Sequence, residues 1–205
     1  MFAKGVILMR KNLLTLLFAA FLSQVAIIDT NSIAAEERQV IDIAGLPVKG
    51  PANASVTIIV FSDYLCPVCN GLEPVLHQVL VKYPNDVKLV NKLCPYHDFS
   101  REAVEAAFAA LDQGKFWEYH DLLFYNQLVL NKPKITAIAE ELHLDLKRFN
   151  KKMKDPAIHK LIDRDMADVT RLGIVGTPTV YINGKVLKDR SLQGFQTAIE
   201  GELSK

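Results

Sequence analysis

Two segments with different hydrophobic periodicities meet near residue 66. Residues 56–61 read Val-Thr-Ile-Ile-Val-Phe, an uninterrupted apolar and β-branched run that is typical of a buried strand. After Cys69 the apolar positions recur at helical intervals and form one face of a helix. The residues of that face are Leu72, Val75, Leu76, Val79, Leu80 and Tyr83. The pattern therefore predicts a buried strand followed directly by an amphipathic helix.

The rest of the chain continues to alternate between the two kinds of pattern. Asp155-Pro156 is an N-cap followed by proline at the first helical position, and Asn183-Gly184 is the strongest short signal for a hairpin. The order predicts an α/β fold, with a mixed central sheet flanked by helices and a helical subdomain inserted before the closing hairpin. Further strands are expected at 40–43 (a possible edge strand), 86–90, 179–182 and 185–188; helices are expected throughout 99–155, from 156 to about 172, and near the C-terminus at 192–203.

The N-terminal 34 residues have the layout of a secretory signal peptide. Basic residues precede an apolar run from Leu13 to Leu22, and Ser32-Ile33-Ala34 supplies small residues for cleavage. Ser23 and Gln24 interrupt the apolar run before it reaches the roughly 20 residues of a membrane span. We expect the protein to be periplasmic or otherwise exported, with an uncleaved N-terminal anchor as the alternative.

Cleavage after residue 34 leaves 171 residues with 21 basic and 22 acidic side chains, a net charge of −1. This length suits one domain, residues 35–205, with a substantial core. The near-neutral charge argues against nucleic acid or an anionic membrane as the partner. Three cysteines in an exported chain indicate one redox pair and one remaining thiol, and not a disulfide scaffold.

Cys66-Pro67-Val68-Cys69 lies where the predicted strand passes into the predicted helix. Pro67 suits the first turn of a helix, where its missing N–H is not needed. Cys66 is then at the helix N-terminus, where unpaired N–H groups and the helix dipole favour an anion. Thiol pKa values at such positions fall to roughly 3.5–7.5. The sequence therefore predicts a nucleophilic thiolate at Cys66.

The third cysteine allows a competing interpretation. Cys94 and His97 follow the second predicted strand, and with Cys66 and Cys69 they have the ligand spacing of a zinc site. Zinc knuckles occupy tight turns in small domains, whereas Cys66 and Cys69 open a long helix in a chain with a large core. Cys94 itself is interpreted as a small buried residue, with a modulatory thiol as the alternative. Asp63 is interpreted as a turn-stabilising acceptor, and a proton relay is the alternative.

Three stretches in order, residues 61–69, 113–121 and 176–180, resemble the thioredoxin fold and, more closely, the exported DsbA-like thiol:disulfide oxidoreductases. The resemblance covers about residues 45–203 and implies a thioredoxin-like fold in which 99–155 are the inserted helical subdomain. It also implies that the protein is an enzyme that needs no cofactor. Its partners would be cysteine-containing exported polypeptides and a membrane protein that recycles the disulfide.

The resemblance assigns a role to each matching residue. Cys66 corresponds to the attacking cysteine and Cys69 to the resolving one. Pro178 corresponds to the cis-proline beside the sulfurs, and Thr177 offers its backbone to a substrate strand. Pro67 and Val68 complete the motif, with Val68 where strongly oxidising members carry histidine. An oxidase is favoured, and an isomerase or reductase is the alternative. A monomer is expected, because too few residues precede the central strand for an added dimerisation region.

Overall fold

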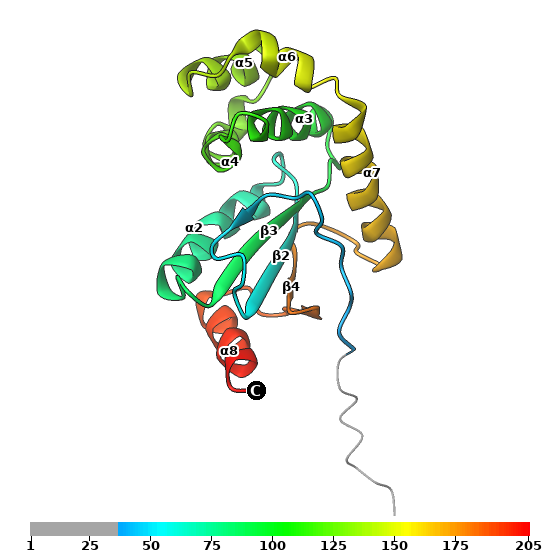
Figure 1. The fold of residues 1–205 in the computed structure, drawn as a ribbon. Coiled ribbons are helices and arrows are strands. Elements are labelled where there is room, and N and C mark those ends of the chain that lie inside the picture. Colours follow the sequence, from blue (N-terminus) through cyan, green and yellow to red (C-terminus); the bar gives the residue numbers. More distant parts are fainter. Residues whose placement is uncertain (1–36) are drawn as a thin grey trace, which may run out of the picture. The chain divides into compact units, whose positions relative to one another are not determined.

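The computed structural model describes residues 37–205 (Figure 1). The predicted signal peptide lies outside these residues. Residues 38–205 form one unit that contains every element described below. In this part of the chain, no helix is both long enough and apolar enough to cross a membrane. In chain order the elements are β1 (Val48–Lys49), β2 (Val56–Ser62), α2 (Pro67–Lys82), β3 (Val87–Leu93), α3 (Ser100–Leu111), α4 (Phe116–Tyr125), the 3-10 turn η1 (Gln127–Val129), α5 (Lys132–Glu141), α6 (Leu146–Lys152), α7 (Pro156–Arg171), β4 (Thr179–Ile182), β5 (Lys185–Val186) and α8 (Leu192–Leu203).

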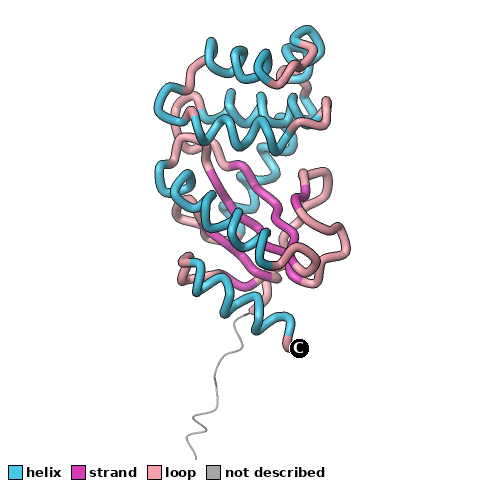
Figure 2. The backbone as a smooth tube through the Cα atoms, turned by 90° about the vertical axis from the view of Figure 1, so that its left-hand side faces the viewer, coloured by secondary structure: helices cyan, strands magenta, loops and turns pink. Residues whose placement is uncertain are grey.

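The strands, magenta in Figure 2, form one mixed sheet. Its five strands are in the order β1-β3-β2-β4-β5. The central strand β2 runs parallel to β3 and antiparallel to β4. Helices cover both of its faces, which explains why its sequence is apolar at successive positions. Ile58 and Val60 pack with α2 and α8, whereas Ile59 and Phe61 face Val169 of α7. This confirms the predicted α/β class with a mixed central sheet.

Helices α3 to α6 form the predicted inserted layer beside the sheet (Figure 1). Five of the buried positions on α3 are alanines, so the neighbouring helices can approach it closely. Phe108 of α3 packs against Phe116 of α4, with ring centroids 5.8 Å apart. The same cluster includes Tyr64, Cys66 and Cys69. The inserted helices therefore contribute directly to the surroundings of the cysteine pair.

The predicted edge strand at 40–43 is wrong, because the edge strand is β1, which pairs antiparallel with β3. Backbone carbonyl groups at 40–44 accept hydrogen bonds from side chains and not from a neighbouring strand. Those of Val40, Asp42 and Ala44 accept hydrogen bonds from Arg171, Lys92 and Arg164, respectively. Two other strands differ from the predicted ranges only in length. β3 continues to Leu93, beyond the predicted end at 90, and β5 ends at Val186, before the predicted end at 188.

Candidate active site

Cys66 is the N-cap residue of α2, and its carbonyl accepts hydrogen bonds from the N–H groups of Cys69 at 3.1 Å and Asn70 at 3.2 Å. Its backbone is extended, and Pro67 takes the first position of the helix. The cysteine side chains are free thiols, 7% exposed at Cys66 and 1% at Cys69. Both thiols are therefore buried, and that of Cys66 is the more accessible of the two.

The loop that enters β4 lies against Cys66. The Thr177–Pro178 peptide bond is cis, and the Cys66 Sγ lies 3.4 Å from the Thr177 carbonyl oxygen. This contact joins residues 111 positions apart. The pairing of β4 with β2 explains the contact, because it brings Thr179 opposite Phe61 and so places the loop before β4 beside the turn that follows β2. Val68 is 61% exposed beside the thiols, and Val175, at the start of the same loop, is fully exposed.

The two thiols of the motif have opposite pKa shifts. Burial alone would raise the pKa of Cys66, but hydrogen bonds from the Thr177 side chain, the Cys69 and Val68 N–H groups and the Cys69 thiol together lower it. Burial dominates at Cys69 and raises its pKa to about 11. Near neutral pH, Cys66 is therefore the better nucleophile and the better leaving group of the pair.

Asp63 is a turn-stabilising acceptor, as interpreted from the sequence. Its buried carboxylate accepts hydrogen bonds from the N–H groups of Leu65, Tyr96 and His97 and from the hydroxyl of Ser100. The His97 ring also binds it, at 2.8 Å. Asp63 thus fixes the turn before Cys66 to the loop that follows β3.

Gln127, in the inserted helical layer, is a site residue that the sequence analysis missed. Its side-chain amide donates to the Tyr64 carbonyl at 2.7 Å and to the Cys66 carbonyl at 3.0 Å. Asn70 donates to the Gln127 side-chain oxygen and to the Phe124 carbonyl. Gln127 has no local sequence signal, because the two carbonyl groups to which it donates are more than 60 positions away.

The four residues proposed as zinc ligands are not gathered together. Residues 37–205 contain no group of three or more His, Cys, Asp or Glu side chains that could hold a metal ion. His97 binds Asp63, and Cys94 is completely buried, with its Sγ 3.5 Å from the Lys92 carbonyl. The packing that separates these side chains argues against the zinc alternative.

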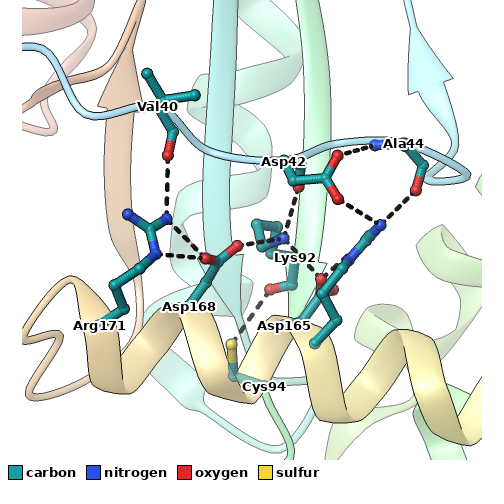
Figure 3. A network of polar contacts seen from close by, with 9 residues as sticks. Val40, Asp42, Ala44, Lys92, Cys94, Asp165, Asp168 and Arg171 are labelled. Atoms are coloured by element: carbon teal, nitrogen blue, oxygen red, sulfur yellow. Dashed lines mark hydrogen bonds and ion pairs between the residues drawn. The ribbon is translucent and has the colours of Figure 1, made fainter.

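Beside Cys94 lies a buried ionic network (Figure 3). The Lys92 ammonium group is 2.7 Å from Asp165 and 3.0 Å from Asp168 of α7, and it also donates to the Asp42 carbonyl. Burial and the nearby Asp165 carboxylate raise the pKa of Cys94. Cys94 is therefore a packed, protonated thiol.

The profile of the thioredoxin family matches residues 44–201. The chain belongs to the thioredoxin family. Its fold is that of the DsbA-like thiol:disulfide oxidoreductases. A thioredoxin-like oxidoreductase from Silicibacter pomeroyi DSS-3 is 28% identical, with a TM-score of 0.71 over 78% of this chain and 93% of that one. BdbD from Bacillus subtilis is 24% identical, with a TM-score of 0.73 over 82% of this chain and 98% of that one.

Curated relatives match a similar region of the chain. The Na(+)/H(+) antiporter NhaA 3 of Salinispora tropica is 38% identical over 141 residues, which are 67% of this chain and 22% of the antiporter. The chain therefore spans about a fifth of the length of the curated relatives that it matches. Most of the antiporter's length has no counterpart in this thioredoxin-family chain.

Proposed function

We propose that this protein exchanges disulfides with cysteines of exported polypeptides through Cys66 and Cys69. The observation that carries the proposal is the thiol pair at the N-terminus of α2, in which the pKa of Cys66 is lowered and that of Cys69 is raised. Membership of the thioredoxin family supports it. We assign Cys66 as the attacking cysteine and Cys69 as the resolving one.

In the oxidising direction, a substrate thiolate attacks Cys66 of the Cys66–Cys69 disulfide. The new sulfur–sulfur bond forms as the old one breaks, and Cys69 leaves with the electron pair and takes up a proton. A second substrate thiolate then attacks the substrate sulfur of the mixed disulfide and expels Cys66 as a thiolate. The substrate leaves with a disulfide, and the protein is reduced by two electrons.

The opposite pKa shifts favour this direction. A lowered pKa makes Cys66 a good leaving group and stabilises the reduced protein, which raises the oxidising power of the disulfide. A pKa of about 11 leaves Cys69 mostly protonated, so it attacks the mixed disulfide slowly and gives the second substrate thiol time to react. We therefore favour an oxidase over an isomerase or reductase.

The remaining elements of the proposal concern the substrate and the partners. The Thr177 backbone, beside Pro178 and close to the Cys66 sulfur, offers polar groups to an extended substrate segment. The protein acts after export as a monomer, and a membrane protein reoxidises the pair. Pro67 and Val68 shape the turn, with Val68 exposed to the incoming substrate.

Trapping of the mixed disulfide tests the proposal. The Cys69→Ser variant, incubated with a disulfide-bonded peptide, should accumulate a covalent adduct at Cys66 that mass spectrometry detects. The oxidised wild-type protein should convert a dithiol peptide to its disulfide, and Cys94→Ser should do so at the same rate. Exchange at an undiminished rate in Cys66→Ser would refute the assignment. Faster rescue of a scrambled substrate than oxidation of a reduced one would move the protein to the isomerase class.

A further inference from the structure

A pocket of about 290 Å³ lies between α2 and α4 and has no part in the exchange steps above. Six residues of α2 line it, and four of them recur at i, i+3, i+7 and i+10, namely Asn70, Glu73, His77 and Leu80. At about 1.5 Å per residue this α2 wall runs for roughly 15 Å along the helix. It begins at Asn70, one residue after Cys69, and follows the side of α2 that faces α4.

The polar side chains of the pocket favour a cation. Glu73 and Asp121 supply two carboxylates, and Lys49 supplies one ammonium group. That ammonium group lies 5.2 Å from the centre of the Trp117 ring and 3.7 Å from the Asp121 carboxylate. A cation between an aromatic face and a carboxylate is a favourable arrangement, and in this structure the cation is the ammonium group of Lys49.

Lys49 holds this position loosely. Its side chain is 36% exposed and that of Asp121 is 60% exposed, and ion pairs of this kind contribute little stability. Glu73, whose side chain is 22% exposed, approaches the buried His120 ring at 3.5 Å. The pocket has two carboxylates and one lysine, so a basic side chain that takes the place of Lys49 over Trp117 still finds both carboxylates beside it.

Much of the rest of the wall is apolar, although Asn70 and His77 also line it. Pro74, Leu80, Leu89 and Phe124 line the pocket around its charged groups. Such a wall suits the methylene stem of a long basic side chain, which packs its carbons on apolar surface and keeps its charge in a polar setting. A small inorganic cation would leave this wall uncovered.

We propose that this pocket binds a lysine or arginine side chain of the partner polypeptide, with its charge over Trp117 between Asp121 and Glu73. The inference rests on the proposed function in taking that partner to be the exchange substrate. Glu73 lies four residues after Cys69, about 6 Å along the helix, and an extended chain advances about 3.3 Å per residue, so the pocket corresponds to a basic residue about two positions from the reacting cysteine. The pocket thus selects substrates by a feature outside their cysteines.

Binding can be measured without any redox step. Trp117 is the only tryptophan of the chain, so its fluorescence reports on the pocket. The full-length chain carrying Cys66→Ser and Cys69→Ser is titrated with a peptide that has arginine two positions from a serine in place of the cysteine. A second peptide carries citrulline, a neutral isostere, in place of the arginine. The arginine peptide should bind about three times more tightly or better.

Variants of the pocket sharpen the test. Asp121→Asn should weaken binding of the arginine peptide about threefold, and Lys49→Met should tighten it because the internal competitor is removed. Asp163→Asn is the matched control: this aspartate is 66% exposed, pairs with Arg101 and should leave binding unchanged. Equal binding of the two peptides, or an Asp121→Asn variant that binds like Asp163→Asn, would overturn the proposal.

Exchange kinetics separate the two proposals. If wild-type protein oxidises cysteine-containing arginine and citrulline peptides at equal kcat/KM, the pocket inference fails and the exchange function stands. If the arginine peptide binds selectively but Cys66 forms no mixed disulfide, the function fails and the binding site stands.

Discussion

Cys66 and Cys94 both follow strands that end at the same edge of the sheet, yet their surroundings are opposite. Cys66 comes after β2 as the N-cap residue of α2, and the N–H groups of Cys69 and Val68 help to lower its pKa. Cys94 comes directly after β3, where its thiol donates to the Lys92 carbonyl and the nearby carboxylates are held by Lys92. The pKa is lowered at Cys66 and raised at Cys94.

This comparison shows that the charges nearest a sulfur do not by themselves decide its reactivity. The ammonium group of Lys92 lowers the pKa of Cys94, but burial and Asp165 raise it by more. Cys66 has no such cation among the causes of its shift and relies on hydrogen bonds from neutral groups. Hydrogen bonds to the thiolate therefore lower the pKa of Cys66. An ammonium group that is already paired with carboxylates does not produce a net lowering at Cys94.

The largest expected difference is in alkylation of the reduced protein. Iodoacetamide should modify Cys66 at least about a thousandfold faster than Cys94 near neutral pH, because Cys94 is reached only through opening of the fold. The rate at Cys66 should rise with pH through a midpoint below that of a free thiol, since its thiolate is stabilised. The rate at Cys69 should rise only towards pH 11. Peptide mapping by mass spectrometry measures all three rates. Similar rates at Cys66 and Cys94 would contradict the claim that the two thiols differ in reactivity.

The next effect tests whether the network beside Cys94 is structural. Lys92→Met leaves the buried Asp165 and Asp168 without their shared cation, and we expect a loss of about 3–5 kcal/mol in the free energy of unfolding. Lys88→Met on the same strand removes an ammonium group that lies at the surface on the Ala52 carbonyl, and should cost less than about 1 kcal/mol. Urea unfolding compares the two. Equal stability of both variants would show that the network contributes nothing.

The smallest expected effect concerns the hydrogen bonds at Cys66. Thr177→Val removes the hydroxyl that helps to lower the pKa of Cys66 and keeps the backbone carbonyl in place. Alkylation of Cys66 at mildly acidic pH should slow by about two- to tenfold, because less thiolate is present. Thr170→Val, at an exposed position of α7, is the control and should change nothing. An unchanged Cys66 profile in Thr177→Val would assign the lowered pKa to the backbone N–H groups and the Cys69 thiol.

The sequence by itself determined the elements with a local signal. The apolar run of β2, the helical spacing after Cys69 and the Asn183-Gly184 turn each depend on neighbouring residues, so the strand, the helix and the hairpin could be predicted. The position of Cys66 at a helix N-terminus follows from the same signals. The extra length of β3 could not be predicted, because Asn91 and Lys92 look like the end of a strand until their buried partners are known.

Only the tertiary structure decided which distant groups meet. The segment at 40–44 has the composition of a strand, but side chains of Lys92, Arg164 and Arg171 bind its carbonyls and a ladder does not form. Gln127 reaches the Cys66 carbonyl from the inserted layer, and the pocket needs α2 and α4 side by side. A hydrogen bond or ion pair across more than 50 positions leaves no periodic trace in the chain, because each partner satisfies a requirement that exists only after folding.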